Sequence, residues 1–147
     1  MQLAEFNLSV WKIDDTSEAA RGFLDKVGQV NALAERADGF VWRLQDESRD
    51  EHGRTPFGGP ETLVTLSVWD SVESLEQFVW KTVHKRILDR KGEWFEKLDR
   101  HHMVLWWVPD GHRPTLDEAR QRLDHRQAHG DTDYAFGWPR PAQMAAE

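Results

Sequence analysis

Four short segments of this chain have the residue pattern of strands, and helical stripes separate them. Three alternate apolar and polar residues, which is typical of half-buried strands, and the fourth is a dense apolar run rich in strand formers. The strands are predicted at residues 3–11, 40–45, 62–69 and 102–108. This feature constrains the fold most, because each helix must bury its stripe against the same small sheet.

Two helical regions lie between these strands. The first is expected to run from N-cap residues at 14–17 to a stop at Gly39. The second begins with capping-box spacing at Asp70, and a break is expected near Thr82 or Gly92. The order is therefore strand, helix, strand, strand, helix, strand.

The fold class predicted from this order is α+β, ferredoxin-like βαββαβ with an added C-terminal helix and tail. The added helix follows Pro114 and Thr115 and is expected to end at about His129. Residues 1–147 show no linker or internal repeat, so one domain is expected.

Charge and composition limit the functions that this chain can have. The formal net charge is -7, which repels phosphate backbones, so nucleic acid is not an expected partner, and neither is a membrane. The chain has no cysteine, which excludes disulfides, thiolate metal sites and a cysteine nucleophile. Because no secretion signal or membrane-length apolar run is visible, a cytoplasmic location is expected.

The strand alternation predicts which side chains share the sheet face away from the main helices. We expect the apolar set of Ala4, Phe6, Trp42, Leu44, Val64, Leu66, Val68 and Leu105 to point to those helices. The opposite, uncovered face is then expected to carry Glu5, Asn7, Ser9, Trp11, Arg43, Gln45, Thr65, Ser67, Trp69, His102, Val104 and Trp106. Aromatic rings mixed with convergent polar groups are typical of a pocket for a small organic molecule, and a dimer interface is the alternative.

Arg43 and His84 are the strongest candidates for chemistry. A guanidinium in mid-strand must be paired or face a cavity that holds an anionic or carbonyl-bearing ligand, and Glu5 is the expected internal partner. His84 shares an edge of the apolar stripe with Trp80, and its imidazole could transfer a proton or bind a metal. A structural salt bridge and a histidine held in place by hydrogen bonds are the alternatives. No metal site is predicted, because His125 and His129 lack the glutamate of a zinc-binding helix.

Four blocks of this sequence resemble a bacterial family catalogued as domain of unknown function 3291. They are NALAERADGFVWRLQ at 31–45, SVWDSVESLEQFVWKTVH at 67–84, EWFEKL at 93–98 and VLWWVPDGHRPTLDEA at 104–119. The resemblance implies a relation to the dimeric α+β barrels, in which two ferredoxin-like domains join their sheets. Because those barrels are dimeric, the resemblance also implies a homodimer. The group includes cofactor-free monooxygenases, haem enzymes and small isomerases.

The leading functional hypothesis is a small-molecule, monooxygenase-like enzyme without a cofactor. Arg43 and Asn7 would stabilise an enolate-like anion, with His84 as the third catalytic residue. The ligand-binding residues are predicted to be Trp69, Trp106, Ser9, Gln45 and Ser67. The alternatives are a haem- or small-ligand-binding module with His84 as axial ligand, and a non-catalytic structural dimer.

Overall fold

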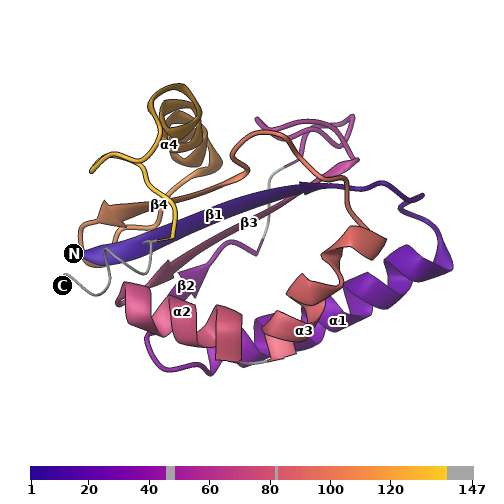
Figure 1. Ribbon diagram of the computed structural model, residues 1–147, viewed down its shortest axis with the longest axis horizontal. Coiled ribbons are helices and arrows are strands. Elements are labelled where there is room, and N and C mark those ends of the chain that lie inside the picture. The colour runs from indigo at the N-terminus through magenta and orange to yellow at the C-terminus, as the bar shows by residue number, and fades with distance from the viewer. Residues whose placement is uncertain (46–48, 82, 139–147) are drawn as a thin grey trace.

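The computed structural model describes residues 1–45, 49–81 and 83–138, with the backbone alone at residues 83 and 84, and it confirms the ferredoxin-like order (Figure 1). The elements are β1 (Gln2–Val10), α1 (Glu18–Glu35), β2 (Phe40–Arg43), β3 (Thr62–Trp69), α2 (Val72–Lys81), α3 (Val83–Asp89), a 3-10 turn (Lys91–Glu93), β4 (Met103–Val108) and α4 (Leu116–His129). The second helical region ends before Gly92, because α3 ends at Asp89 and a 3-10 turn follows at Lys91–Glu93, whereas the alternative break at Thr82 lies outside the described residues. None of the helices in the described ranges is long and apolar enough to cross a membrane.

The four strands form one antiparallel sheet in the order β2-β3-β1-β4. The register places Arg43 of β2 opposite Ser67 of β3, Ser67 opposite Glu5 of β1, and Glu5 opposite Leu105 of β4. Directly opposite residues point to the same side of a sheet. These four side chains therefore form one row across the face that Leu105 shares.

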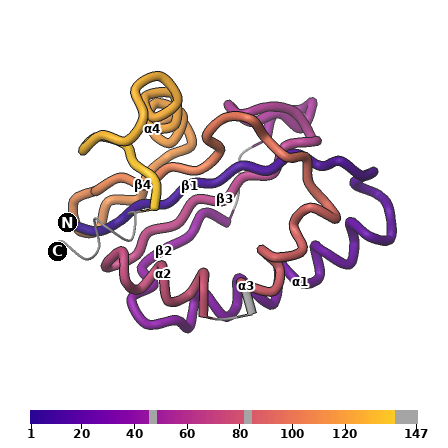
Figure 2. The backbone as a smooth tube through the Cα atoms, in the orientation of Figure 1, coloured from indigo at the N-terminus to yellow at the C-terminus, as the bar shows by residue number. Residues whose placement is uncertain are grey.

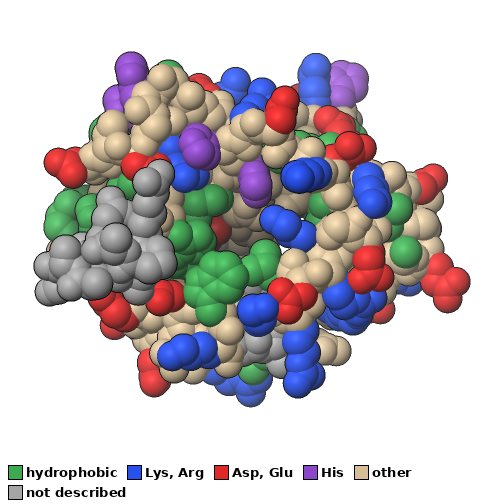
Figure 3. Space-filling view, viewed as in Figure 1, with side chains coloured by type: hydrophobic (Ala, Val, Ile, Leu, Met, Phe, Trp, Pro, Cys, Tyr) green, Lys and Arg blue, Asp and Glu red, His purple; other side chains and the backbone are tan. Residues whose placement is uncertain are grey.

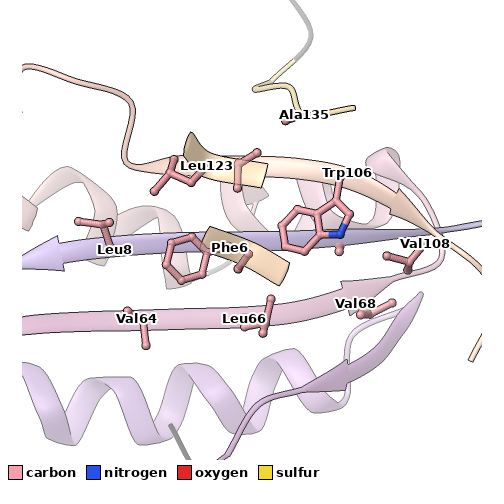
Figure 4. Close-up of a cluster of buried hydrophobic side chains, with 12 residues drawn as sticks. Phe6, Leu8, Val64, Leu66, Val68, Trp106, Val108, Leu123 and Ala135 are labelled. Carbon is pink, nitrogen blue, oxygen red and sulfur yellow. The ribbon is translucent and has the colours of Figure 1, made fainter. Parts of the chain in front are cut away.

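One face of the sheet is apolar, and α4 covers it. The α4-side core consists of Ala4, Phe6, Leu8, Val64, Leu66, Val68, Val104, Trp106, Val108, Ala119, Leu123 and Ala135, and Figure 4 shows its sheet residues beside Leu123 of α4. The connection between β2 and β3 adds Phe57, whose ring stacks on Phe6 with centroids 4.2 Å apart. Apart from Phe57, which is partly buried, every member of this core is 8% exposed or less.

The other face carries α1, α2 and α3, which form a layer parallel to the sheet in Figures 1 and 2. Two apolar clusters connect this layer to the two ends of the sheet. The Trp69 cluster consists of Leu3, Val30, Ala34, Trp69, Leu75, Phe78 and Leu105. The Trp94 cluster consists of Trp11, Ala20, Trp94 and Phe95.

Two expectations about the sheet faces are wrong. The main helices cover the face of Glu5, Ser67 and Trp69, whereas the apolar set, apart from Leu105, lies on the opposite face, which α4 covers. The alternation fixed which residues share a face, but it could not say which face each helix covers. The face opposite the main helices was expected to be uncovered, but the added helix α4 covers it, because this is the more apolar face of the sheet.

The second correction concerns the phase of β4. Phe6 lies opposite Val104 and Ala4 opposite Trp106, so Val104 and Trp106 belong to the α4-side core. Leu105 does point to the main helices as expected, but it shares the face of Glu5 and not that of Ala4 and Phe6. The run MVLWWV is apolar at every position, and a continuous apolar run contains no alternation from which its phase could be inferred.

Helix ends follow the capping chemistry of the sequence. Ser17 Oγ accepts a hydrogen bond from Ala20 N at 3.2 Å, and Thr115 Oγ1 accepts one from Glu118 N at 3.2 Å. Gly39, the predicted stop, has φ of 84°, and a Cβ there would collide with the Ser74 side chain. Glycine is therefore required where α1 turns into β2.

Candidate functional site

The sheet face that α1, α2 and α3 cover is polar in its middle. On β1, Glu5, Asn7 and Ser9 lie between Leu3 of the Trp69 cluster and Trp11 of the Trp94 cluster. On β3, Ser67 and Thr65 occupy the same stretch, opposite Glu5 and Asn7 respectively. Because period-two alternation puts all of these residues on one face, the two apolar clusters enclose a polar centre.

Glu5 is the central side chain of this polar stretch. Its Oε2 accepts a hydrogen bond from Ser67 Oγ at 2.7 Å, and its Oε1 accepts one from Thr65 Oγ1 at 3.2 Å. Both donors come from β3, directly opposite and one row along. The carboxyl group is therefore held in one orientation by both of its oxygens.

Burial raises the pKa of Glu5 to about 7, although the hydrogen bonds from Ser67 and Thr65 lower it. Desolvation disfavours the charged form of a carboxyl, and this effect exceeds the stabilisation from the two hydroxyl groups. At neutral pH both the protonated and the ionised forms of Glu5 are then populated. A carboxyl group in this state can accept or donate a proton, which is what general acid–base catalysis requires.

Trp69 and Ser67, both predicted ligand-binding residues, lie beside Glu5. The indole Nε1–H of Trp69 donates to Ser67 Oγ at 3.0 Å. The Trp69 ring is 1% exposed, and it packs against Phe40 and Phe78 with centroids 5.5 and 5.3 Å away. Trp69 is therefore a buried support of the site, and Ser67 links it to the carboxyl group.

Arg43 is on the Glu5 face, but its partner differs from the expected one. Its Nε donates to Oε1 of Glu35 at 2.7 Å, so the predicted pairing with Glu5 is wrong. Glu35 lies at the end of α1, which leads through Gly39 into β2. The Arg43 side chain is 25% exposed and occupies the row of Ser67 and Glu5.

The remaining polar candidates differ in position. Asn7 is partly buried beside Glu5 on the same face, and Ser9, opposite Leu63, continues this row of side chains. Gln45 lies beyond the end of β2 and is exposed. The structure therefore groups Asn7 and Ser9 with Glu5 on one strand and leaves Gln45 at the margin.

Trp106 and His102 do not belong to this site. Trp106 is fully buried in the α4-side core, where its Nε1–H donates to Glu118 Oε2 at 2.8 Å. His102 precedes β4 on the same side as Trp106, and burial lowers its pKa. Trp106 was predicted to bind ligand and His102 to share the polar face, and both expectations are wrong because β4 has the opposite phase.

His84 lies in α3, but its side chain is outside the described part of the structure. Its catalytic role and the haem alternative that depends on it therefore stay predictions. Among the residues that the structure describes, no three histidine or carboxylate side chains come together as they would to hold a metal ion.

The molecular surface is hollowed over the middle of the sheet in the space-filling view, which has the orientation of Figure 1 (Figure 3). Hydrophobic, basic and histidine side chains border this hollow. At the end of the same sheet face, an open pocket of about 230 Å³ is lined by Trp11, Asp15, Leu24, Arg49, Gly53, Pro60 and Leu63. The row from Glu5 to Ser9 leads toward this pocket, because Ser9 lies opposite Leu63.

Glu5 is the residue whose importance the sequence did not reveal. Its place on the polar face was predicted, but only as a partner for Arg43. The available signal was a carboxylate in mid-strand with apolar residues on both neighbouring positions, Ala4 and Phe6. A charge placed there is costly unless it is paired or used.

Solved structures and family models relate this chain to known proteins. A protein of unknown function from Nitrosomonas europaea is 13% identical, with a TM-score of 0.51, over 78% of this chain and 95% of that one. A protein from Chloroflexus aurantiacus, assigned provisionally to the antibiotic biosynthesis monooxygenases, is 15% identical, with a TM-score of 0.47, over 78% and 98%. The first likeness shows the fold, and the second is too weak to carry an argument.

The comparison with curated proteins found no match. The family model described as "Domain of unknown function (DUF3291)" matches residues 2–147, nearly the whole chain. The chain therefore belongs to this family.

Proposed function

We propose that this protein is an acid–base enzyme that moves a proton to or from a small organic molecule at Glu5. The observation that carries the proposal is the Glu5 carboxyl group, partly buried between two apolar clusters with its pKa raised to about 7. A carboxyl whose pKa is strongly perturbed by burial is a candidate for function. A purely structural role explains it poorly, because a buried carboxylate costs stability unless it is fully paired.

In the proposed reaction, Glu5 removes a proton from a hydroxyl group or from an activated carbon of the substrate. The negative charge left on the substrate would be stabilised by the Arg43 guanidinium and the Asn7 amide, which lie on the same face. Donors already fixed in place stabilise a developing anion strongly. The two apolar clusters would exclude water from the substrate ring.

The finer form of the proposal is a monooxygenase-like reaction without a cofactor. The deprotonated substrate would be oxidised by molecular oxygen, so that a phenol and O₂ give a quinone and one water. One oxygen atom enters the ring, and the other leaves as water with two substrate hydrogens. The support is the site itself, since an acid–base carboxyl beside a cation suits formation of the anion on which this reaction depends.

A homodimer is part of the same proposal, following from the family resemblance. Since α4 covers the apolar sheet face, a barrel shared by two copies would include α4 at its contact. Native mass spectrometry tests this directly, because one chain has a mass of 17.2 kDa. A species of twice that mass is expected, and a monomer at all concentrations would refute the dimer.

The acid–base function can be tested with a panel of phenols and 1,3-diketones that includes 4-nitrophenol. Binding at the site is expected to shift the amide resonances of Glu5 and Thr65 in NMR spectra, and bound 4-nitrophenol should show its visible phenolate band at pH 7. Glu5→Gln cannot accept the proton, so a smaller fraction of the bound probe should be phenolate than in the wild type at the same pH. The function would be refuted if the panel leaves these resonances unmoved, or if Glu5→Gln ionises the probe as the wild type does.

Arg43→Leu is expected to weaken binding of the 4-nitrophenol anion about tenfold or more, because a charge-assisted hydrogen bond contributes about 1.5–3 kcal/mol. Arg43→Lys retains the charge and should lose less. Absorbance titration at pH 8, where the probe is largely ionised, measures the affinity. If Arg43→Leu binds as tightly as the wild type, Arg43 serves only to link β2 to α1 through Glu35.

A further inference from the structure

Trp69, Ser67 and Glu5 form a directed chain of hydrogen bonds. The Trp69 indole nitrogen can only donate, and it donates to Ser67 Oγ at 3.0 Å. Ser67 Oγ in turn lies 2.7 Å from Glu5 Oε2. Since the serine oxygen accepts from the indole, the single hydroxyl hydrogen of Ser67 is directed to the carboxyl group, and hydrogen bonds in such chains strengthen one another.

The tryptophan end of this hydrogen-bond chain is rigid. Trp69 is 1% exposed in the last position of β3, and its ring is packed against Phe40 and Phe78. A ring held on two sides keeps its N–H in one direction. Ser67, two residues earlier on the same face of β3, therefore receives a hydrogen bond from a donor with a fixed direction.

The two carboxyl oxygens of Glu5 have different surroundings. Oε2 receives the short bond from the fixed Ser67 hydroxyl, whereas Oε1 receives the longer 3.2 Å bond from Thr65, which is exposed. A hydroxyl on an exposed residue can turn to water or to a ligand. Oε1 is thus the oxygen that lies on the open side of the pair.

We propose that Trp69 is a positioning residue for Glu5: its indole N–H turns the Ser67 hydroxyl toward Oε2, and thereby leaves Oε1 as the oxygen that exchanges a proton with the substrate. The inference rests on the proposed function of Glu5. In the step itself, a substrate O–H or C–H bond breaks, its electron pair stays on the substrate, and the proton forms a bond to Oε1. Trp69 does not touch the substrate and acts only through Ser67.

Two other ionisable candidates have to be separated from this effect. On β2, Arg43 occupies the same row and is paired with Glu35 of α1. On α3, His84 is the titratable residue that the sequence predicts to be catalytic, and its side chain lies outside the described part of the structure. The hydrogen-bond chain from Trp69 lies within β1 and β3, so its effect on Glu5 can be measured separately from these groups.

The test is an NMR titration of the Glu5 side-chain carboxyl in a double-mutant cycle. Ser67 lowers the pKa of Glu5, so Ser67→Ala should raise the titration midpoint, and Trp69→Phe, which keeps a ring but loses the N–H, should raise it in the same direction. In the Ser67→Ala background, Trp69→Phe should have no further effect, because its path is already broken. Thr65→Val acts on the other oxygen, so its effect should add to that of Trp69→Phe.

Trp106→Phe is the matched control, since it removes an indole donor on the opposite face of the sheet and should leave the Glu5 midpoint unchanged. If Trp69→Phe does not fold, the wild-type protein still tests the proposal. As pH is varied, the Trp69 indole N–H resonance should shift with the same midpoint as the Glu5 carboxyl group. The proposal is overturned if that resonance does not follow Glu5, or if Trp69→Phe shifts the midpoint equally with and without Ser67. The proposed function is tested separately by the probe panel, so it can be refuted there even if the double-mutant cycle gives the expected result.

Discussion

Replacing Trp106 by alanine is expected to lower the free energy of unfolding by about 3–5 kcal/mol, the usual cost of removing a large aromatic side chain from a core. The ring is fully buried under α4, and the loss also leaves Glu118 without the indole donor. Denaturant unfolding measures the change. The Glu5 titration should be unaffected, because Trp106 lies on the opposite face.

Trp107→Ala is the matched control for this prediction. Trp107 is the next residue along β4, it faces the other side, and it is 39% exposed. Trp107→Ala should lower the free energy of unfolding by well under half as much as Trp106→Ala does. If Trp106→Ala were instead stable but unable to bind the phenol probes, Trp106 would line the ligand site, and β4 would have the opposite phase to the one in the structure.

Replacing Glu5 by glutamine is expected to stabilise the protein above pH 7. The ordinary pKa of a glutamate is 4.5, and in the folded chain that of Glu5 is raised to about 7. Between these values the folded state keeps a proton that the unfolded state releases, so stability is full below pH 4.5 and falls as pH rises to about 7. The shift corresponds to a loss of at most about 3 kcal/mol.

Glutamine is neutral at every pH, so the variant should lack this fall in stability and should exceed the wild type at pH 8. Denaturant unfolding from pH 4 to pH 8 gives both curves. Glu96→Gln, at an exposed position, serves as the control and should follow the wild type. Parallel curves for Glu5→Gln and the wild type would show that Glu5 is not buried in the way the structure indicates. Functional residues often reduce stability, so Glu5→Gln should be more stable and less active than the wild type.

The order of elements could be predicted from the sequence because each segment had a clear period. The strand predicted at 62–69 coincides with β3, and the caps at Ser17 and Thr115 are where helix-start chemistry placed them. The phase of β4 could not be predicted, since its residues are apolar at every position. The face covered by the main helices was also beyond reach, because α4 competes for the more apolar side.

For the site, strand alternation correctly grouped Asn7, Arg43 and Ser67 on one face with Glu5. It could not identify the partners, since the ion pair of Arg43 with Glu35 depends on how α1 packs beside β2. The bond from Trp69 to Ser67 likewise depends on the side-chain orientation of a packed ring. The raised pKa of Glu5 follows from its burial, which is a property of the folded chain.

The most direct test of the acid–base role of Glu5 is the titration midpoint of its carboxyl group, measured by carbon-detected NMR on the wild-type protein and assigned with Glu5→Gln. A midpoint of about 7 is expected. A midpoint near the ordinary 4.5 of a glutamate would show a solvated carboxylate and would contradict both the acid–base function and the role of Trp69.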